Sequence, residues 1–212
     1  MTRDPATYSW LSSALLADNG AAAMDAQIKP LLPSWRFLGR ALTVQVAQGD
    51  NLALHAALSI VEPGQVLVVA AGGYRNRAII GGLMTRQARA SNVAGIVIDG
   101  AIRDTVELRE LDLPVFSIGA HPLGPSKTGE RSAVGIEIEC GGVRVANGDW
   151  VFADADGVAV FADADFDAIV EKAHDKLKRE EKRIADIAFG KLLPPWLAQA
   201  LAEAGLDVKK PS

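Results

Sequence analysis

Residues 95–104 read GIVIDGAIRD. The first four residues of this stretch are apolar or glycine and end at Asp99, a pattern that predicts a buried strand. Arg103 and Asp104 close the stretch, so they would lie at the carboxyl end of that strand. Ligands of open α/β sheets bind outside the carboxyl ends of the strands. The stretch therefore predicts both a sheet and a binding site at one of its edges.

The segments around this stretch alternate between strand and helix patterns. Further strands are expected over 41–47, 66–70 and 113–119. Helices are expected over 52–61, 82–92 and 105–111. Asp50 and Asn51 are expected to cap the first of these helices, and residues 71–80 are expected to form a loop. This alternation predicts an α/β fold around a central sheet.

Beyond residue 133, the sequence changes to short strand patterns separated by Gly-Gly, Asn-Gly and Asp-Gly pairs. Such pairs are typical of the tight turns of antiparallel hairpins. Residues 164–190 predict one long amphipathic helix, and a short proline-initiated helix follows around Trp196. We expect a single domain over residues 1–212, with a helical extension over about 164–212.

Length and composition are those of a globular domain with a substantial core: 212 residues, 49% apolar and 23% charged. The net charge of −4 argues against a nucleic-acid partner, although residues 176–183 form a local basic cluster. The single cysteine, Cys140, excludes an internal disulfide and fits a reducing compartment. The sequence shows neither a charged leader with an apolar core nor an apolar run of about 20 residues. We therefore expect a cytoplasmic protein with no membrane partner.

A candidate anion site begins at Gly81, Gly82, Leu83 and Met84, where a loop passes into a helix. The first N–H groups of a helix have no partner within the helix, so they can bind a carboxylate or a phosphate. The alternative, which a glycine pair alone favours, is a tight turn or a close helix–sheet contact. The string is neither a dinucleotide fingerprint nor a phosphate-binding loop, because it lacks the spaced glycines and the Gly-Lys-Ser/Thr ending.

The second candidate group is Arg103 with Asp104, supported by Asp99 and Glu107. Arginine binds carboxylates through two parallel hydrogen bonds and stabilises negative charge on a reacting oxygen. A carboxylate binds hard divalent cations. Both properties serve enolate chemistry. An ion pair at a helix start would have the same sequence, but the position at the end of a strand favours a site.

Other polar and aromatic residues give weaker signals. Three histidines, His55, His121 and His174, lack the paired spacing of a zinc site, so we expect packing or surface roles. Cys140 is expected to be a buried, inert thiol, and residues 154–157 are expected to form a hairpin turn. Tryptophans are expected in the core or in subunit contacts: Trp35, Trp150 and Trp196.

Together, these blocks resemble the RraA-like family of 4-hydroxy-4-methyl-2-oxoglutarate/4-carboxy-4-hydroxy-2-oxoadipate aldolases and the related regulator of ribonuclease E activity A. The resemblance runs through SSALLAD, PGQVLVVA, GGLMTRQARASNVAGIVIDGAIRD, LPVFSIG and GDWVFADADGVAVF. It implies a single-domain swivelling β/β/α fold with a central sheet, hairpins and a long C-terminal helix. It also implies homotrimers or dimers of trimers, that is hexamers, with sites at subunit boundaries.

The resemblance implies roles for individual residues. The backbone of Gly81, Gly82, Leu83 and Met84 would hold the carboxylate of a 2-oxo acid substrate. Arg103 would contact the oxo or hydroxyl oxygens of the substrate, and Asp104 would bind Mg²⁺ or Mn²⁺, with water at most other metal positions. A glutamate from the C-terminal helix of the neighbouring subunit would approach those waters. Its spacing from the glycine that ends the helix points to Glu180, with Glu181 as the alternative, and a solvated surface role is open for both.

The implied activity is that of a divalent-metal-dependent lyase, a class II pyruvate aldolase that releases pyruvate from 4-hydroxy-4-methyl-2-oxoglutarate-type 2-oxo acids. Oxaloacetate decarboxylation is the second implied reaction. One departure bears on cleavage, because catalytic members often have an acidic residue where this chain has Gly82. Two alternatives stay open: a non-catalytic regulator that binds ribonuclease E, and a lyase on the same scaffold with another substrate.

Overall fold

The fold is built around strand β6 (Gly95–Ile102), whose eight residues are all buried. The structure, a computed structural model, describes residues 4–208. β6 pairs in parallel with β4 (Gln65–Ala70) on one side and with β7 (Val115–Ala120) on the other. The prediction of a buried strand is confirmed, and the strand continues three residues beyond Asp99.

The main sheet has the strand order β1-β12-β11-β3-β4-β6-β7-β2, while β5 pairs with β6 and β8 with β3. The remaining strands of this sheet are β1 (Ala22–Ala23), β2 (Lys29–Pro30), β3 (Phe37–Gln45), β5 (Ala78–Ile80), β8 (Ala133–Val134), β11 (Trp150–Asp154) and β12 (Gly157–Phe161). The pairs β3–β4, β4–β6, β5–β6 and β6–β7 are parallel, and the others are antiparallel. The parallel strands are thus central, and the hairpin of β11 and β12 extends one edge.

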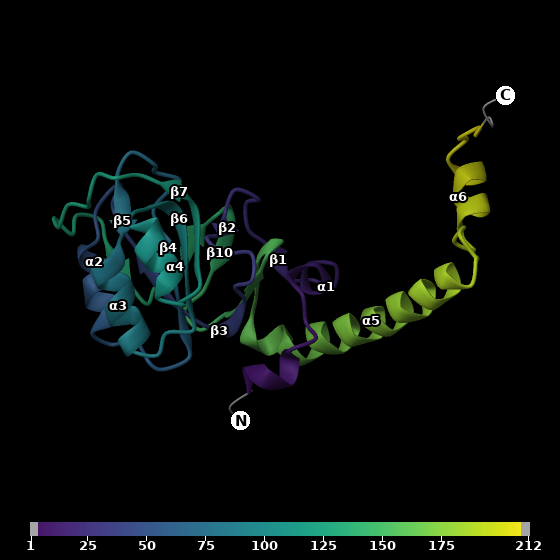
Figure 1. Cartoon of the computed structure of the whole chain (residues 1–212), viewed down its shortest axis with the longest axis horizontal. Coiled ribbons are helices and arrows are strands. Elements are labelled where there is room, and N and C mark those ends of the chain that lie inside the picture. The colour runs from purple at the N-terminus through teal and green to yellow at the C-terminus, as the bar shows by residue number, and fades with distance from the viewer. Residues whose placement is uncertain (1–3, 209–212) are drawn as a thin grey trace. The chain divides into compact units, whose positions relative to one another are not determined.

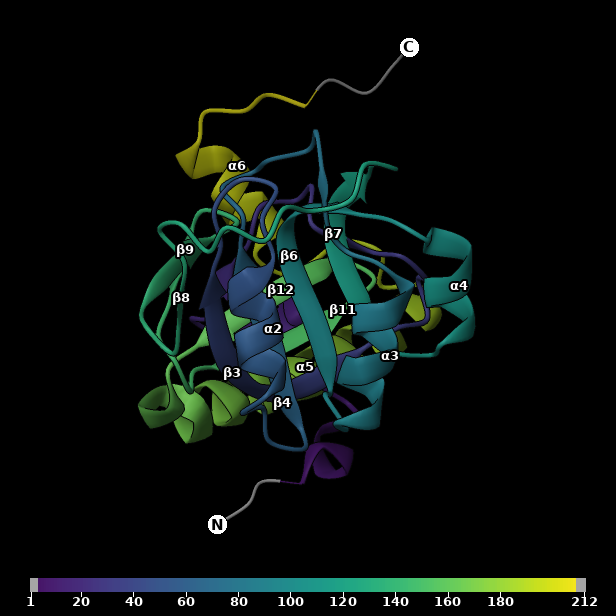
Figure 2. The same ribbon diagram turned by 90° about the vertical axis from the view of Figure 1, so that its left-hand side faces the viewer.

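Three helices connect the parallel strands: α2 (Leu52–Leu58), α3 (Gly82–Ala90) and α4 (Thr105–Glu110). Two parallel neighbouring strands run in the same direction, so the chain has to return to the starting edge of the sheet between them. A helix usually forms this crossover, because a tight turn is too short for it. Figure 2 shows α2 and α3 lying in front of the strands, with α4 beside α3. The starts of α3 and α4 follow β5 and β6, so both helices begin at the carboxyl edge of the parallel strands.

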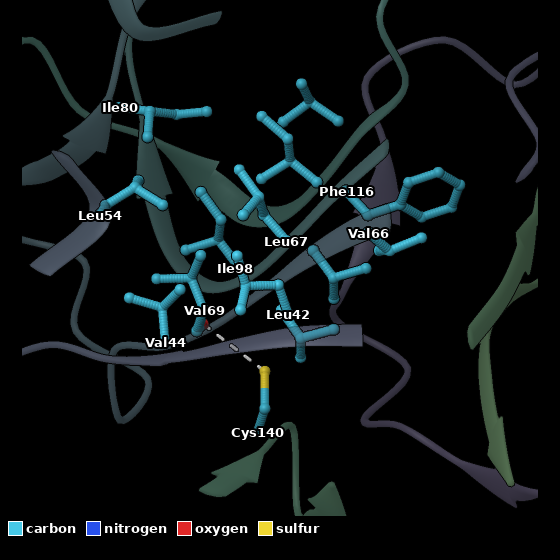
Figure 3. Close-up of a cluster of buried hydrophobic side chains, with 14 of the residues drawn as sticks. Leu42, Val44, Leu54, Val66, Leu67, Val69, Ile80, Ile98, Phe116 and Cys140 are labelled. Carbon is cyan, nitrogen blue, oxygen red and sulfur yellow. Dashed lines mark hydrogen bonds between the residues drawn. The ribbon is translucent and has the colours of Figure 1, made fainter. Parts of the chain in front are cut away.

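The hairpin of β9 (Ile138–Cys140) and β10 (Val143–Val145) packs against β4. Cys140 is fully buried, and its Sγ lies 3.6 Å from the carbonyl oxygen of Val69 (Figure 3). Burial raises the pKa of the Cys140 thiol, so the thiolate is disfavoured. The expectation of a buried thiol is confirmed, and the raised pKa agrees with the expectation that the thiol is inert.

The chain divides into two compact units, one up to Ala173 and a second from His174 onward. The first unit also contains η1 (Pro5–Tyr8), α1 (Ser13–Ala17), η2 (Asp163–Asp165) and the first turns of α5 (Phe166–Ala188). The rest of α5 and α6 (Leu197–Glu203) form the second (Figure 1). Both predicted C-terminal helices are present. Within residues 4–208, no helix combines the length and apolar character needed to cross a membrane.

Two local predictions are wrong. The expected loop 71–80 contains β5, which pairs with the end of β6 where the register shifts. The Asn-Gly pair at 147–148 does not form a hairpin, because β10 pairs with β9 and β11 pairs with β3 and β12. The side chain of Asn147 instead accepts a hydrogen bond of 3.2 Å from the backbone N–H of Thr43. The Gly-Gly and Asp-Gly turns form the predicted hairpins.

Aromatic packing restricts the first residue of β6. A Cβ on Gly95 would approach the ring of Phe37 more closely than real Cβ atoms allow. That ring is buried and packs edge-on against Phe116 at 5.4 Å, so it has little freedom to move. Glycine at the start of GIVIDGAIRD is therefore a packing requirement.

Gly95→Ala is expected to lower the free energy of unfolding by about 1–3 kcal/mol, because the added methyl group overpacks the core. Urea unfolding measures the loss. In a Phe37→Leu background the same substitution should cost less, since the ring that it meets is gone. An equal cost in both backgrounds would contradict this packing argument.

Candidate active site

Arg103 and Asp104 form the junction between β6 and α4. Asp104 has φ 57° and ψ 38°, the left-handed region that few residues other than glycine adopt. Aspartate and asparagine tolerate this region better than most side chains. The Asp104 side chain makes no capping hydrogen bond to α4, so its carboxylate is available to a partner outside its own helix.

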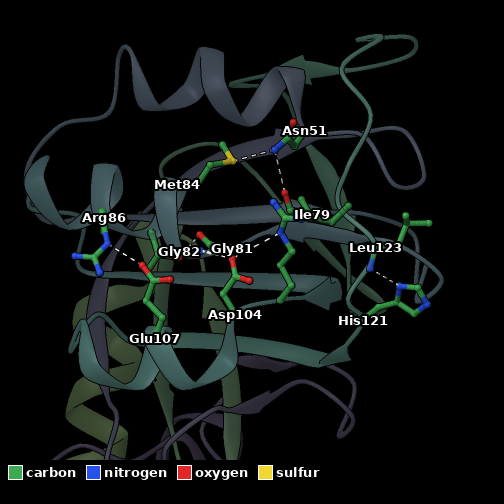
Figure 4. Close-up of polar contacts among 12 residues, drawn as sticks. Asn51, Ile79, Gly81, Gly82, Met84, Arg86, Asp104, Glu107, His121 and Leu123 are labelled. Atoms are coloured by element: carbon green, nitrogen blue, oxygen red, sulfur yellow. Dashed lines mark hydrogen bonds and ion pairs between the residues drawn. The ribbon is translucent and has the colours of Figure 1, made fainter.

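That partner is the start of α3. The N–H of Gly82 donates a 2.9 Å hydrogen bond to Oδ2 of Asp104 (Figure 4). The next two N–H groups, those of Leu83 and Met84, donate to no other residue among those that the structure describes, as is usual in a first helical turn. The two groups of residues singled out by the sequence therefore lie side by side. The N–H of Gly82, however, is already used within the protein.

The Arg103 side chain lies against glycine backbone. A Cβ at Gly81 or at Gly124 would come within 3.0 Å of Arg103 atoms. Nε of Arg103 lies 3.7 Å from Oδ2 of Asp104, which is an ion pair but too long for a hydrogen bond. This N–H is buried and has no hydrogen-bond partner among residues 4–208. The two side chains remain 41% and 43% exposed, so both charges are accessible to a ligand.

Glu107 comes from the first turn of α4. Its Oε1 accepts a 2.7 Å hydrogen bond from Nε of Arg86 on α3 (Figure 4). A Cβ on Gly82 would lie well under 3.0 Å from both oxygens and the carbon of the Glu107 carboxylate. The carboxylate thus occupies the space that any side chain at position 82 would need. The expected support of Arg103 and Asp104 by Glu107 stays a prediction, and the contact of Glu107 with Gly82 was not predictable from the sequence.

Asp99 does not support Arg103 and Asp104, contrary to the sequence prediction. Its carboxylate accepts hydrogen bonds from the backbone N–H groups of Ala71 and Gly141. It lines a separate cavity of about 400 Å³ together with Arg75 and Gly141. Burial raises the pKa of Asp99 above its ordinary value, against the effect of these hydrogen bonds. The side chain serves to join the loop after β4 to the β9–β10 turn.

Asp50 ties the start of α2 to the segment 126–129. Its carboxylate, only 1% exposed, accepts five hydrogen bonds, from Leu52 N–H, the Ser126 hydroxyl, Thr128 N–H, the Thr128 hydroxyl and Gly129 N–H. Burial alone would raise the pKa of Asp50, but the hydrogen bonds outweigh burial and lower the pKa to about 2. The expected cap is confirmed for Asp50, and its larger role is to hold the segment that follows Gly124.

Asn51 occupies the N-cap position of α2 as predicted, but its side chain makes no capping hydrogen bond. Its Nδ2 donates instead to the carbonyl of Ile79 at 3.1 Å and to Sδ of Met84 at 3.0 Å (Figure 4). These contacts hold the end of β5 and the first turn of α3 together from the buried side. Asp50 and Asn51 are thus positioning residues, whereas their place before the helix predicted only caps.

A hydrated divalent cation fits this group of residues. Oδ1 of Asp104 accepts no hydrogen bond from residues 4–208, so one oxygen can coordinate a metal. Within the same residues, no three His, Cys, Asp or Glu side chains form a metal-binding cluster. Mg²⁺ commonly binds through one or two carboxylates and keeps several waters, which matches a single exposed aspartate.

Glu180 and Glu181 lie on α5 in the second unit. Oε1 of Glu180 is 3.6 Å from Nζ of Lys176, one helical turn earlier, and the Glu180 side chain is 49% exposed. An exposed pair of this kind contributes little to stability. The role of either glutamate in a neighbouring site stays a prediction.

The fold and the site define an α/β protein with an arginine and a carboxylate at the carboxyl end of its central parallel strand, next to a helix start. Residues 11–160 match the model of the RraA-like family, described as Aldolase/RraA. The chain belongs to this family. It is 38% identical over 165 residues to a protein of Halalkalibacterium halodurans named "Putative 4-hydroxy-4-methyl-2-oxoglutarate aldolase", and the match covers 78% of each chain.

Two solved structures share the fold. RraAS2 of Streptomyces coelicolor, described as an unusual member of the RNase ES inhibitor RraA protein family, is 32% identical with a TM-score of 0.74, over 83% of this chain and 93% of its own. The RNA-processing inhibitor RraA from Thermus thermophilis is 32% identical with a TM-score of 0.66, over 71% and 92%. The swivelling β/β/α fold expected from the sequence is confirmed. The names of these relatives cover both an aldolase and RNA-processing inhibitors.

Asp50→Asn is expected to lower the free energy of unfolding at pH 7 by on the order of 2 kcal/mol, because an amide replaces an ionised acceptor of five hydrogen bonds. Urea unfolding between pH 7 and pH 2 measures this difference. The lowered pKa stabilises the folded protein above the ordinary aspartate pKa of 3.8, and this stabilisation is lost as pH falls toward about 2.

The difference between wild type and variant should therefore shrink from about pH 4 downward. Asp112→Asn, a change of the same chemistry at an exposed position, is the matched control and should leave stability nearly constant. A difference at Asp50 that does not vary with pH would contradict the assigned role of the carboxylate charge.

Proposed function

We propose that this protein is a divalent-metal-dependent lyase that releases pyruvate from 2-oxo acids, with 4-hydroxy-4-methyl-2-oxoglutarate-type acids and oxaloacetate as substrates. The observation that carries the proposal is the contact between Asp104 and the start of α3, beside Arg103. This contact places an exposed carboxylate, an exposed guanidinium and unpaired helix N–H groups in one place. The negative charge of a 2-oxo acid complements the guanidinium and the N–H groups, and a divalent cation would complement the carboxylate.

The helix start binds the carboxylate of the substrate in this proposal. Because the N–H of Gly82 is bonded to Asp104, the N–H groups of Leu83 and Met84 are the ones left for the ligand. This removes Gly82 from the sequence-based expectation, in which the backbone of Gly81, Gly82, Leu83 and Met84 formed the cradle. The missing side chain at Gly81 still matters, since it lets Asp104 and Arg103 approach the backbone.

Arg103 stabilises the oxygen on which negative charge develops. Cleavage of the C3–C4 bond, or loss of carbon dioxide from oxaloacetate, leaves an electron pair that spreads onto the C2 oxygen as an enolate. The guanidinium presents fixed donors toward that charge. When bound at Asp104, Mg²⁺ or Mn²⁺ would supply Lewis-acid polarisation of the oxo group. Arg103 and Asp104 are thus expected to act on the same developing charge.

The activity is tested by coupling pyruvate release to lactate dehydrogenase, with oxaloacetate and 4-hydroxy-4-methyl-2-oxoglutarate as substrates. Pyruvate should appear with Mg²⁺ or Mn²⁺ and fall to background with EDTA. Asp104→Asn keeps the shape and tolerates the left-handed backbone, so it should fold normally and lose at least about 100-fold in rate. Full activity of a correctly folded Asp104→Asn or Asp104→Ala protein would exclude Asp104 as the ligand.

A second candidate function is regulation of an RNA-processing nuclease such as ribonuclease E without catalysis. The descriptions of the Streptomyces and Thermus relatives as inhibitors favour it. The same assay separates the two functions. Metal-independent background rates with both substrates, together with binding of ribonuclease E, would favour the regulator.

The proposal includes a homotrimer or a hexamer in which Glu180 of one subunit completes the site of the next. Glu180→Gln should lower activity at least about 10-fold, whereas Glu181→Gln, its neighbour in the same charged run, should not. A mixing experiment tests the subunit boundary directly. Asp104→Asn and Glu180→Gln chains, unfolded and refolded together, should be more active than either variant refolded alone.

Recovery is expected because a mixed oligomer contains some sites with both wild-type residues. No recovery, with mixed oligomers shown by native mass spectrometry, would place Glu180 in its own subunit's site or outside the site. Equal activity of Glu180→Gln and wild type would remove Glu180 from the mechanism.

A further inference from the structure

The space above Gly82 is filled by a functional group from another helix. The α3 start has no side chain at this position, and the carboxylate of Glu107 lies where a side chain would project. The three atoms nearest to a Cβ on Gly82 all belong to that carboxylate. Because the obstructing group is the end of a flexible side chain, a residue larger than glycine at position 82 would displace Glu107 and leave the backbone in place.

One oxygen of the Glu107 carboxylate is held by a hydrogen bond. Oε1 accepts from Nε of Arg86 at 2.7 Å, while Oε2 has no hydrogen-bond donor among residues 4–208. The Glu107 side chain is 37% exposed, so Oε2 is accessible to water or to a ligand. An oriented carboxylate with one unused oxygen is suited to accept and return a proton.

The two carboxylates of the site, those of Asp104 and Glu107, have different neighbours. Asp104 is bonded to the N–H of Gly82, and Glu107 lies on the side-chain face of the same residue. Asp104 adjoins Arg103, whereas Glu107 is paired with Arg86. Each carboxylate thus keeps one oxygen without a donor among residues 4–208, and the two differ in their neighbours: Asp104 lies beside Arg103, the oxyanion partner, and Glu107 beside Arg86.

We propose that Glu107 is the catalytic acid–base residue of this site. This inference rests on the proposed lyase function. In cleavage of a 4-hydroxy-2-oxo acid, Oε2 of Glu107 accepts the proton of the C4 hydroxyl group, and C4–O becomes a carbonyl. The C3–C4 bond breaks, and its electron pair remains on the pyruvyl fragment as the enolate. The protonated Glu107 then returns the proton to C3, which yields pyruvate and restores the carboxylate.

Glu107→Gln tests this role, because it keeps the size and the hydrogen bond to Arg86 but cannot accept a proton. Three measurements are needed: the Mn²⁺ affinity, the thermal unfolding midpoint, and the exchange of pyruvate methyl protons for deuterium in D₂O followed by NMR. The exchange isolates proton transfer at C3 from bond cleavage. The variant is expected to bind Mn²⁺ like wild type and to lose at least about 100-fold in exchange and in cleavage.

Two further variants sharpen the test. Glu110→Gln removes the same charge from an exposed position on the same helix and should keep wild-type exchange. Gly82→Ala alters no functional group but takes the space of the Glu107 carboxylate, so it should fold, bind Mn²⁺ and lose exchange as Glu107→Gln does. The double variant should be no slower than either single variant, because both act on one group.

Exchange by Glu107→Gln within about threefold of wild type would overturn the role of Glu107 and leave the lyase function standing. Loss of Mn²⁺ affinity in step with exchange would overturn it as well, in favour of metal binding or structure. If the wild-type protein neither exchanges pyruvate protons nor releases pyruvate from either substrate, the lyase function fails and this inference fails with it.

Discussion

The site depends on one steric constraint: side chains from the β6–α4 junction and α4 lie directly on backbone that has no Cβ. At Gly81 the missing atom leaves room for Asp104 and Arg103, at Gly82 for Glu107, and at Gly124 for Arg103. The hydrogen bond from Gly82 to Asp104 forms only at this close approach. Close packing of this kind fixes charged side chains without burying them, so they stay accessible to a ligand and lose little freedom on binding.

Two adjacent residues hold both sides of this arrangement in place. Asp50 fixes the segment that follows Gly124, and Gly124 lies against the Arg103 guanidinium. Asn51 fixes the junction of β5 and α3 through Ile79 and Met84. Both side chains are buried, and both act through hydrogen bonds that a shift of the backbone would break. The left-handed conformation of Asp104 adds a local cost that this framework has to offset.

Local patterns in the sequence predicted the alternating strands and helices, the position of Arg103 and Asp104 at a strand end, and the adjoining helix start. They could not predict β5, because a three-residue strand has no periodicity and pairs only where the register of β6 shifts. They also misplaced Asp99, whose carboxylate reaches the loop after β4 and the β9–β10 turn. The Gly82–Glu107 contact joins residues 25 positions apart, and no local pattern reports such a contact.

The departure at Gly82 takes on a different meaning in three dimensions. Proton transfer depends on where a carboxylate lies relative to the reacting atoms, and any helix or strand can supply that carboxylate. A short side chain at the start of α3 or a longer one from α4 can occupy this space, but the two cannot occupy it together. Glycine at position 82 is therefore the condition for Glu107 to lie where it does. Its presence is no argument against chemistry at this helix start.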